Sequence, residues 1–278
     1  MTSQRVVPLS EEAPSEGAPH DGEAIDVAPE PDEPLADVFD WPIEPATMPQ
    51  VVSLLRGPSD HPRLIVTVNV ALMWMASVDP RLSRIVQNSS LRVADGMGVI
   101  WSWRALGRRL PERVAGIDLM VELIAAAAQD GRSIYLLGAK QEVLDRLTEI
   151  LVSDYPGLEI AGSHHGYFVE GDHNKIVGDI KASGADLLFI GMPSPFKEFW
   201  AAEHLAEVGA DLVMGVGGSF DVISGFVPRA PRPMQRAGLE WAWRLACEPR
   251  RMWKRYAVTN AWLARRVVTA LLRRRRAR

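Results

Sequence analysis

The chain has almost no cysteine, which limits the chemistry it can contain. Cys247 is the one cysteine in 278 residues, so the sequence excludes an internal disulfide bond and any metal site built from several thiolates. Cys247 stands among apolar residues just before Glu248 and Pro249. We therefore expect a small packed side chain at this position rather than a nucleophile.

Long apolar segments are missing as well. Nowhere do about 18 apolar residues follow one another, as a helix that crosses a bilayer requires. The first residues also show no basic start, apolar run and small-residue cleavage site of the kind that forms a secretory signal. We therefore expect a cytoplasmic protein.

Common metal and nucleotide motifs are absent too. The chain contains no His-Glu-x-x-His and no Walker A sequence, and its folded region has no Asp-x-Asp. His164 and His165 are adjacent, so on a strand they point to opposite faces and do not suggest a pair of ligands. We expect neither a metal nor a cofactor. Without a metal, negative charge on a ligand has to be neutralised by arginines or backbone dipoles.

Charge is distributed very unevenly, although the net charge is only −4. Residues 1–45, the acidic head, contain twelve acidic residues against one arginine and almost no aromatic side chains, a composition typical of a disordered segment. Residues 250–278 contain eleven lysines or arginines and no acidic residue. Four of the nine tryptophans also lie between residues 241 and 262. We predict that this basic end binds a negatively charged partner.

Between the two ends, apolar runs alternate with helical patterns. The alternation predicts a Rossmann-like α/β fold, in which one parallel sheet has helices on both faces. The expected strands are 64–69, 92–95, 133–138, 158–162, 186–191 and 211–216. The expected helices are 47–56, 80–89, 97–106, 118–129, 140–154, 174–183 and 198–208. We assign residues 1–45 to a disordered tail, 46–228 to a catalytic domain and 229–278 to a basic helical appendage.

Residues that directly follow the strands are the candidates for a site, because ligands of parallel sheets bind beyond the carboxyl ends of the strands. Asp95 follows one strand and precedes a helix, so spacing alone favours a helix cap over a functional carboxylate. A functional role requires further polar residues to converge there. Thr67, Asn69 and Arg113 are the candidates.

A glycine-rich run follows the last expected strand. Backbone N–H groups of Gly217 and Gly218, ahead of Asp221, would be available to a phosphate at the start of a helix. The run does not match the dinucleotide-binding fingerprint, because Phe220 occupies the position of the third glycine. A phosphate-binding role therefore needs support from elsewhere in the chain.

The basic end has the pattern of an amphipathic helix. At about 100° per residue, Trp253, Val267 and Leu271 share one side, while lysines and arginines gather on the other side together with Trp262. A basic amphipathic helix with aromatic anchors suits a membrane surface of anionic lipids. Binding of nucleic acid by residues 273–276 is the competing hypothesis, and the acidic head argues against it by charge repulsion.

Several of these residues belong to motifs whose order resembles that of one enzyme family. The motifs are Thr67-x-Asn69, Asp95-Gly96-x-Gly98, Arg113-x-x-Gly116-x-Asp118-Leu119, Gly166-Tyr167-Phe168, Gly217-Gly218-x-Phe220-Asp221, Arg229-Ala230-Pro231, Gly238-Leu239-Glu240-Trp241-x-x-Arg244 and Glu248-Pro249-x-Arg251. Over residues 38–256 the chain is similar to the WecG/TagA/CpsF family, glycosyltransferase family 26.

The resemblance implies an inverting, metal-independent enzyme that moves a sugar from a UDP-sugar to a polyprenyl-diphosphate-linked saccharide. It implies peripheral binding to the inner face of the plasma membrane. By the same resemblance, Asp95 is the general base that takes the proton of the acceptor hydroxyl. Thr67 and Asn69 lie at its side, and Arg113 lines the same pocket. The oligomeric state is left open.

Cations near the end of the chain complete the implied site. By resemblance, Arg244 and Arg251 reach the diphosphate of UDP. Lys254 stands where the family has a third arginine, which keeps the charge but loses the bidentate fork. Lys197 stands where the family has an active-site glutamine, and a cation there would bind a phosphate or a carboxylated sugar.

The departures from the family pattern leave open which cell-surface polysaccharide the enzyme helps to make. The run Ser194-Pro195-Phe196-Lys197 and the Pro-rich acidic head favour exopolysaccharide or capsule assembly, with glucose as the donor sugar. The alternative is a transferase of N-acetylmannosamine or its uronic acid, of the teichoic-acid or enterobacterial-antigen type. Outside transferase chemistry, the hypotheses are a non-catalytic nucleotide-binding regulator and a nucleic-acid-binding protein.

Overall fold

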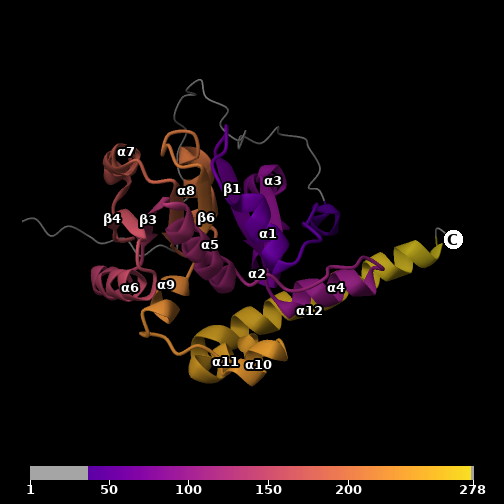
Figure 1. The fold of residues 1–278 in the computed structure, drawn as a ribbon. Coiled ribbons are helices and arrows are strands. Elements are labelled where there is room, and N and C mark those ends of the chain that lie inside the picture. Colours follow the sequence, from indigo (N-terminus) through magenta and orange to yellow (C-terminus); the bar gives the residue numbers. More distant parts are fainter. Residues whose placement is uncertain (1–36, 277–278) are drawn as a thin grey trace, which may run out of the picture.

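The predicted α/β fold is confirmed by the computed structural model. It describes residues 37–276, apart from the side chains of Glu170, Arg251 and residues 274–276. Six parallel strands form one sheet in the order β2-β1-β6-β5-β3-β4 (Figure 1). The strands are β1 (Arg63–Val68), β2 (Leu91–Ala94), β3 (Ser133–Gly138), β4 (Glu159–His164), β5 (Leu187–Gly191) and β6 (Leu212–Gly215). All six agree with the expected strands.

The helices follow the sequence pattern closely before residue 229, with two additions, and three further helices form the basic helical appendage. They are α1 (Met48–Leu55), α2 (Val70–Ala76), α3 (Pro80–Asn88), α4 (Met97–Ala105), α5 (Gly116–Asp130), α6 (Gln141–Asp154), α7 (His173–Ser183), α8 (Phe196–His204), α9 (Ser219–Ile223), α10 (Arg232–Arg236), α11 (Glu240–Cys247) and α12 (Pro249–Arg276), with 3-10 turns η1 (Val38–Asp40) and η2 (Glu170–Asp172). The pattern does not predict α2 and α9 within the sheet region, because such short helices contain too few turns for a clear period.

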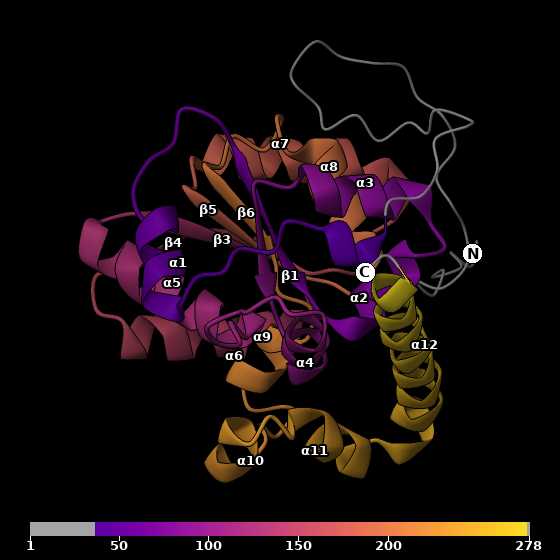
Figure 2. The ribbon, with the colours of Figure 1, turned by 90° about the vertical axis from the view of Figure 1, so that its right-hand side faces the viewer.

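One apolar core lies on each face of the sheet. Alternate residues of β1 divide between them, since successive side chains of a strand point to opposite faces: Val66 enters one core and Ile65 the other. Helices α2, α3, α7 and α8 supply the first core, and α1, α5 and α6 supply the second. Figure 2 shows α3, α7 and α8 on one side of the strands and α5 and α6 on the other.

The folded part of the described chain begins before residue 46, where composition placed the domain boundary. Val38, Phe39 and Trp41 are buried in the first core. The ring of Phe39 meets that of Trp103 on α4 edge-on, with 5.6 Å between the ring centroids. The abundant acids of the acidic head conceal this short apolar run from an argument based on composition. Residues 1–36, for which we predict disorder, lie outside the described residues.

Helix α12 packs against the α/β part of the chain. It lies along α2 and α4, and Trp262, Leu263 and Val267 pack on the first core. An ion pair of 2.9 Å joins Arg266 to Asp37 at the beginning of the described chain. The helical projection, which places Trp262 on the basic side, is wrong for this residue, because tertiary packing on α2 and α4 decides which side of the helix is buried.

Cys247 at the end of α11 is exposed, so the expectation of a packed cysteine is wrong.

Among residues 37–276, no helix has the length and apolarity that would let it cross a membrane.

Candidate active site

The carboxyl ends of three neighbouring strands bring the expected site residues to one edge of the sheet. Thr67 on β1 pairs with Val93 on β2, so Asp95, two residues further on, lies beside the end of β1. β1 leads into α2 on one face, whereas β6, its other neighbour, leads into α9 on the opposite face. Such a divergence between adjacent strands opens the crevice in which ligands of α/β sheets bind.

Thr67 and the start of α5 close this crevice from the inside. Thr67 is buried, and a methyl group at Gly116 would lie 3.4 Å from its hydroxyl oxygen and 3.2 Å from its methyl carbon. The backbone of α5 therefore begins in direct contact with the end of β1. This contact explains a glycine at position 116, where a side chain would push Thr67 away.

Asp95 does not cap α4, the helix that follows it in the sequence, so that interpretation of its position is wrong. Gly96 is the N-cap residue of α4, with a φ of +112° and no side-chain hydrogen bond. Asp95 is half-buried, and its carboxylate accepts a hydrogen bond from the N–H of Gly116. Loss of hydration raises the pKa of Asp95, although Arg113 and Arg244 lower it. Glu240 raises it further, and the net effect is a raised pKa.

Arg113 is held beside Asp95 by a residue of the C-terminal helices. Its guanidinium nitrogen lies 2.5 Å from a carboxylate oxygen of Glu240, and their side chains are only 15% and 19% exposed. Burial alone lowers the pKa of Arg113, but Glu240, Asp95 and Asp118 raise it overall. Arg113 therefore stays charged and fixed in direction next to the carboxylate of Asp95.

A second ion pair links the same two regions. Arg229, which precedes α10, donates to the carboxylate of Asp118 on α5 at 2.6 Å. The same guanidinium lies 3.7 Å from Glu240. Three motifs that are distant in the sequence thus form one network of charges, in which α11 covers the carboxyl edge of the sheet. Figure 1 shows α10 and α11 together beyond that edge, where the chain continues into α12.

Arg244 is the tail cation that the structure brings to the site. It lies on α11, one helical turn beyond Glu240, and is exposed. Its charge acts on the carboxylate of Asp95. The side chain of Arg251, the other arginine expected to reach the diphosphate, lies outside the described residues.

Three other expected site residues have local partners. Asn69 caps α2, since its side-chain oxygen accepts from the N–H of Leu72 at 3.0 Å. Lys254 is exposed on α12, with its ammonium 5.7 Å from the ring centroid of Trp253. Lys197 is buried and pairs with Glu198 on α8.

The surroundings of Lys197 differ from those expected for a residue that contacts the donor. Its side chain runs beneath Gly215, where a methyl group would come within 2.9 Å of its ammonium nitrogen. The Ser194 hydroxyl donates to the same carboxylate oxygen of Glu198, at 2.9 Å. Lys197 therefore neutralises a buried acid under the carboxyl ends of β5 and β6, and no contact of the described residues directs it toward Asp95.

The glycine-rich run forms the turn from β6 to α9. Gly217 has a φ of +55°, a conformation that favours glycine, and Gly218 is the N-cap residue of α9. Asp221 is half-buried in the first turn of α9. These residues lie on the β6 side of the crevice, and Thr67 and Asp95 lie on the β1 side. Among the described residues, no three His, Cys, Asp or Glu side chains gather as candidate metal ligands.

Sequence reasoning did not identify Glu240, Asp118 and Arg229 as site residues, although all three stand in the motifs. The partners are separated by 127 residues for Arg113 and Glu240 and by 111 for Asp118 and Arg229. One signal was available: the motif around residue 113 contains both an arginine and an acid, and so does the motif of residues 238–244. Nothing in the spacing shows which of them pair.

A Rossmann-like sheet whose carboxyl edge carries a half-buried carboxylate between arginines is the framework of a group-transfer enzyme acting on a charged ligand. The chain belongs to the glycosyl transferase WecG/TagA/CpsF family, whose model matches residues 36–277. It is also similar to the N-acetylglucosaminyldiphosphoundecaprenol N-acetyl-beta-D-mannosaminyltransferase of Bacillus spizizenii (strain ATCC 23059 / NRRL B-14472 / W23). The two are 34% identical over 213 residues, which cover 77% of this chain and 80% of that protein. The family resemblance seen in the motifs is thereby confirmed, and with it the assignment as a glycosyltransferase.

Proposed function

We propose that this chain transfers a sugar from a UDP-sugar to a polyprenyl-diphosphate-linked saccharide, with inversion at the anomeric carbon. The observation that carries the proposal is Asp95, a half-buried carboxylate of raised pKa flanked by Arg113 and Arg244. The name of the Bacillus relative describes an acceptor in which a sugar diphosphate is joined to undecaprenol. That name supports the class of acceptor.

The chemistry is a single displacement. Asp95 takes the proton of the acceptor hydroxyl as its oxygen attacks the anomeric carbon, and the bond from that carbon to the UDP oxygen breaks. The electron pair of that bond leaves with UDP, whose added negative charge needs cations in fixed positions. Arg113 meets this need because Glu240 already fixes its direction. Arg244 is the second cation, and Arg251 would be a third.

The crevice between β1 and β6 would hold the donor. Gly217 and Gly218 leave the β6 side of the crevice without side chains, so that the donor diphosphate can approach the backbone. Thr67 and Asn69 lie opposite, close to Asp95. The name of the Bacillus relative makes N-acetylmannosamine the first donor sugar to assay and glucose the second.

Substitution of Asp95 tests the assignment. Asp95→Asn keeps the shape of the side chain and removes the base, so kcat should fall about 10²- to 10⁴-fold. The measurement is UDP release with a panel of UDP-sugars and a polyprenyl-diphosphate-sugar acceptor. Asp145→Asn, at an exposed carboxylate on α6, is the matched control and should leave the rate unchanged. Nearly normal turnover by the Asp95 variant would exclude Asp95 as the base.

Stability measurements show whether the variant is folded. Because the pKa of Asp95 is raised on folding, its ionised form costs folding free energy at pH values above the unfolded value of about 3.9. The cost grows as the pH rises through the folded pKa. Asp95→Asn removes it, so at neutral pH the variant should unfold at the same temperature as the wild type or higher.

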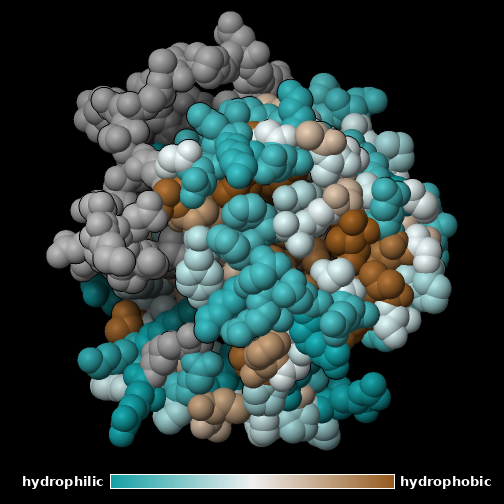
Figure 3. All heavy atoms as spheres, turned by 90° about the vertical axis from the view of Figure 1, so that its left-hand side faces the viewer, coloured by the Kyte–Doolittle hydropathy of each residue, from teal (hydrophilic) through white to brown (hydrophobic). Residues whose placement is uncertain are grey.

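Peripheral binding to an anionic membrane is the second part of the proposal. Helix α12 exposes Trp253, Val268 and Leu272 together with arginines and lysines on the surface that does not pack on α2 and α4. Exposed apolar and basic side chains on one helix are the composition of interfacial anchors. The opposite end of the molecule, at β4, α6 and α7, is mostly hydrophilic, and its main hydrophobic area lies at the right of the view (Figure 3).

Liposome co-sedimentation tests this part. Trp253→Ser with Leu272→Ser should weaken binding to vesicles that contain anionic phospholipid. Leu54→Ser with Val152→Ser removes two exposed apolar side chains from α1 and α6 and is the matched control. Point substitutions are required because removal of α12 would expose the core beneath Trp262. Equal sedimentation of the two double variants would contradict docking through α12.

A further inference from the structure

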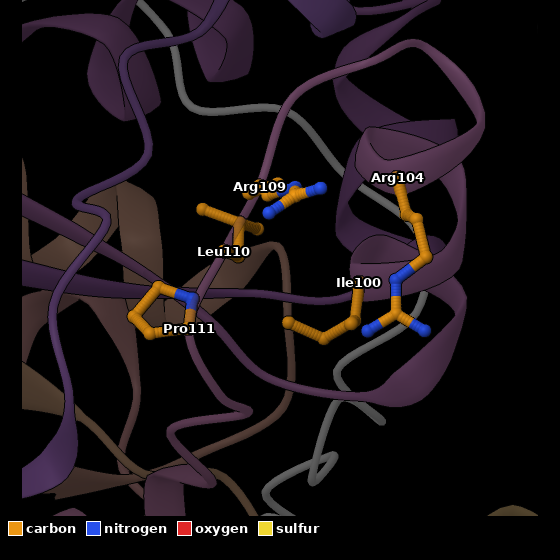
Figure 4. Close-up of a pocket in the computed structure, with 5 residues that line it drawn as sticks. All are labelled: Ile100, Arg104, Arg109, Leu110 and Pro111. Atoms are coloured by element: carbon orange, nitrogen blue, oxygen red, sulfur yellow. The ribbon is translucent and has the colours of Figure 1, made fainter.

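A pocket of about 420 Å³ lies beside the site, between α4 and the segment that returns from it toward Arg113. Ile100 and Arg104 on α4 face Arg109, Leu110 and Pro111 of that segment (Figure 4). The volume is within the usual range for small-molecule sites. The lining combines two exposed arginines with three apolar side chains, of which Ile100 and Leu110 are only 5% and 8% exposed. The exposed cations suit a ligand with an anionic group.

Arg104 and Arg109, the two arginines of the pocket, differ from the neighbouring Arg108 in having no ion pair among the described residues. Arg108 donates to the carbonyl of Phe39 and pairs with Asp40 at 3.3 Å. By contrast, Arg104 and Arg109 are exposed and form no ion pair with any residue in the described part of the chain. Their charge is available to an anion from outside the protein.

The position of the pocket connects it with both Asp95 and the membrane side of the molecule. α4 begins two residues after Asp95, so Ile100 and Arg104 lie roughly 6 and 12 Å along the helix from Gly96. That is the length scale of one sugar ring with an attached diphosphate. Trp101 on the same helix is 50% exposed, and Leu263 of α12 contacts α4 at Gly98. An exposed tryptophan with an arginine one turn away is typical of a membrane interface.

We propose that this pocket is the subsite for the diphosphate of the lipid-linked acceptor. Arg104 and Arg109 bind the diphosphate, and Ile100, Leu110 and Pro111 form the wall between these arginines and Asp95. The sugar of the acceptor then extends along α4 to Asp95, while the rest of the chain leaves past Trp101 toward the membrane. The inference rests on the proposed function and names the part of the site that recognises the lipid.

The test uses a soluble acceptor, so that docking to a membrane plays no part. It carries the sugar diphosphate on a two-unit isoprenoid. Arg104→Gln with Arg109→Gln should raise the KM for this acceptor about 10- to 100-fold, the loss expected for hydrogen bonds to a charged group. The KM for the donor and kcat should stay at wild-type values. The control, Arg146→Gln with Lys175→Gln, removes two exposed charges from α6 and α7 and should change neither constant.

A binding measurement separates this inference from the proposed reaction. Calorimetric titration with geranyl diphosphate, without donor, should show binding that the Arg104/Arg109 double variant loses and the control retains. If the wild type binds geranyl diphosphate but transfers no sugar, the proposed function fails and the pocket stands. If the double variant raises the KM for the donor, or weakens only liposome binding, the pocket is not the acceptor subsite.

Discussion

The carboxyl edge of the sheet and the C-terminal helices build one site by different means. At the edge, Thr67 and Asp95 are brought together by the pairing of two neighbouring strands. The C-terminal helices contribute Glu240 and Arg244, which reach the edge through tertiary contacts across more than a hundred residues. The edge therefore supplies the platform and the proposed base, whereas the helices supply the charges that act on Asp95 and hold Arg113.

The strands of the sheet and the C-terminal helices are also stabilised by different interactions. The strands lie between two cores, and Ile65 and Val66 are both buried. α11 has no residue that is fully buried, and its position depends on the ion pairs that Arg113 and Arg229 form with Glu240 and on its continuation into α12. If the C-terminal helices are an accessory to the platform, substitutions that loosen them should reduce activity without unfolding the sheet.

The largest effect is expected where α12 meets the first core. Trp262→Ala removes a large side chain that packs on this core and should lower the free energy of unfolding by about 3 kcal/mol. Trp253→Ala makes the same change on the same helix at a residue that is 54% exposed, so stability should change by less than about 0.5 kcal/mol. Urea denaturation of both variants measures the difference. Equal losses would mean that α12 does not pack as described.

A smaller effect is expected at the junction itself. Glu240→Gln leaves Arg113 without its charged partner and should lower kcat/KM. The expected fall corresponds to a loss of about 1.5–3 kcal/mol of transition-state stabilisation. Arg113→Gln should be at least as harmful, because it also removes a cation from the site. In the double variant the two losses should fall short of their sum, since each substitution breaks the same pair. Strict additivity would show that the two residues act independently.

Features of the sheet edge could be predicted from sequence because they follow a local pattern, whereas the contacts of the C-terminal helices could not. The strands and the candidates Thr67 and Asp95 follow from a local period and from the rule that sites lie at the carboxyl edge. The roles of Glu240, Asp118 and Arg229 depend on which charges meet after folding, and no local pattern contains that information. The surroundings of Lys197 could not be predicted for a related reason: its burial against Glu198 and Gly215 is a property of the packed fold. The side of α12 that is buried, including Trp262, likewise depends on α2 and α4.

The finest test concerns the influence of α11 on the base at the sheet edge. Asp95 must be ionised to accept a proton, so kcat/KM should fall at acidic pH around its pKa. Since burial raises that pKa above the ordinary value for aspartate, this acid limb should lie at a higher pH than for an exposed aspartate. Arg244 lowers the pKa and Glu240 raises it. Arg244→Gln should therefore move the limb to higher pH, and Glu240→Gln should move it to lower pH.

Opposite shifts from two residues of one helix distinguish electrostatic adjustment of Asp95 from direct contact with the substrate. Loss of a substrate contact at Arg244 lowers kcat/KM equally at every pH, whereas loss of its effect on Asp95 changes the position of the acid limb. Arg236→Gln on α10 removes the same charge from an exposed site and should leave the limb in place. Higher salt should reduce the shift of the Arg244 variant, because Arg244 is exposed and its charge is screened. A limb that does not move in either variant would mean that the C-terminal helices hold the substrate without adjusting the base.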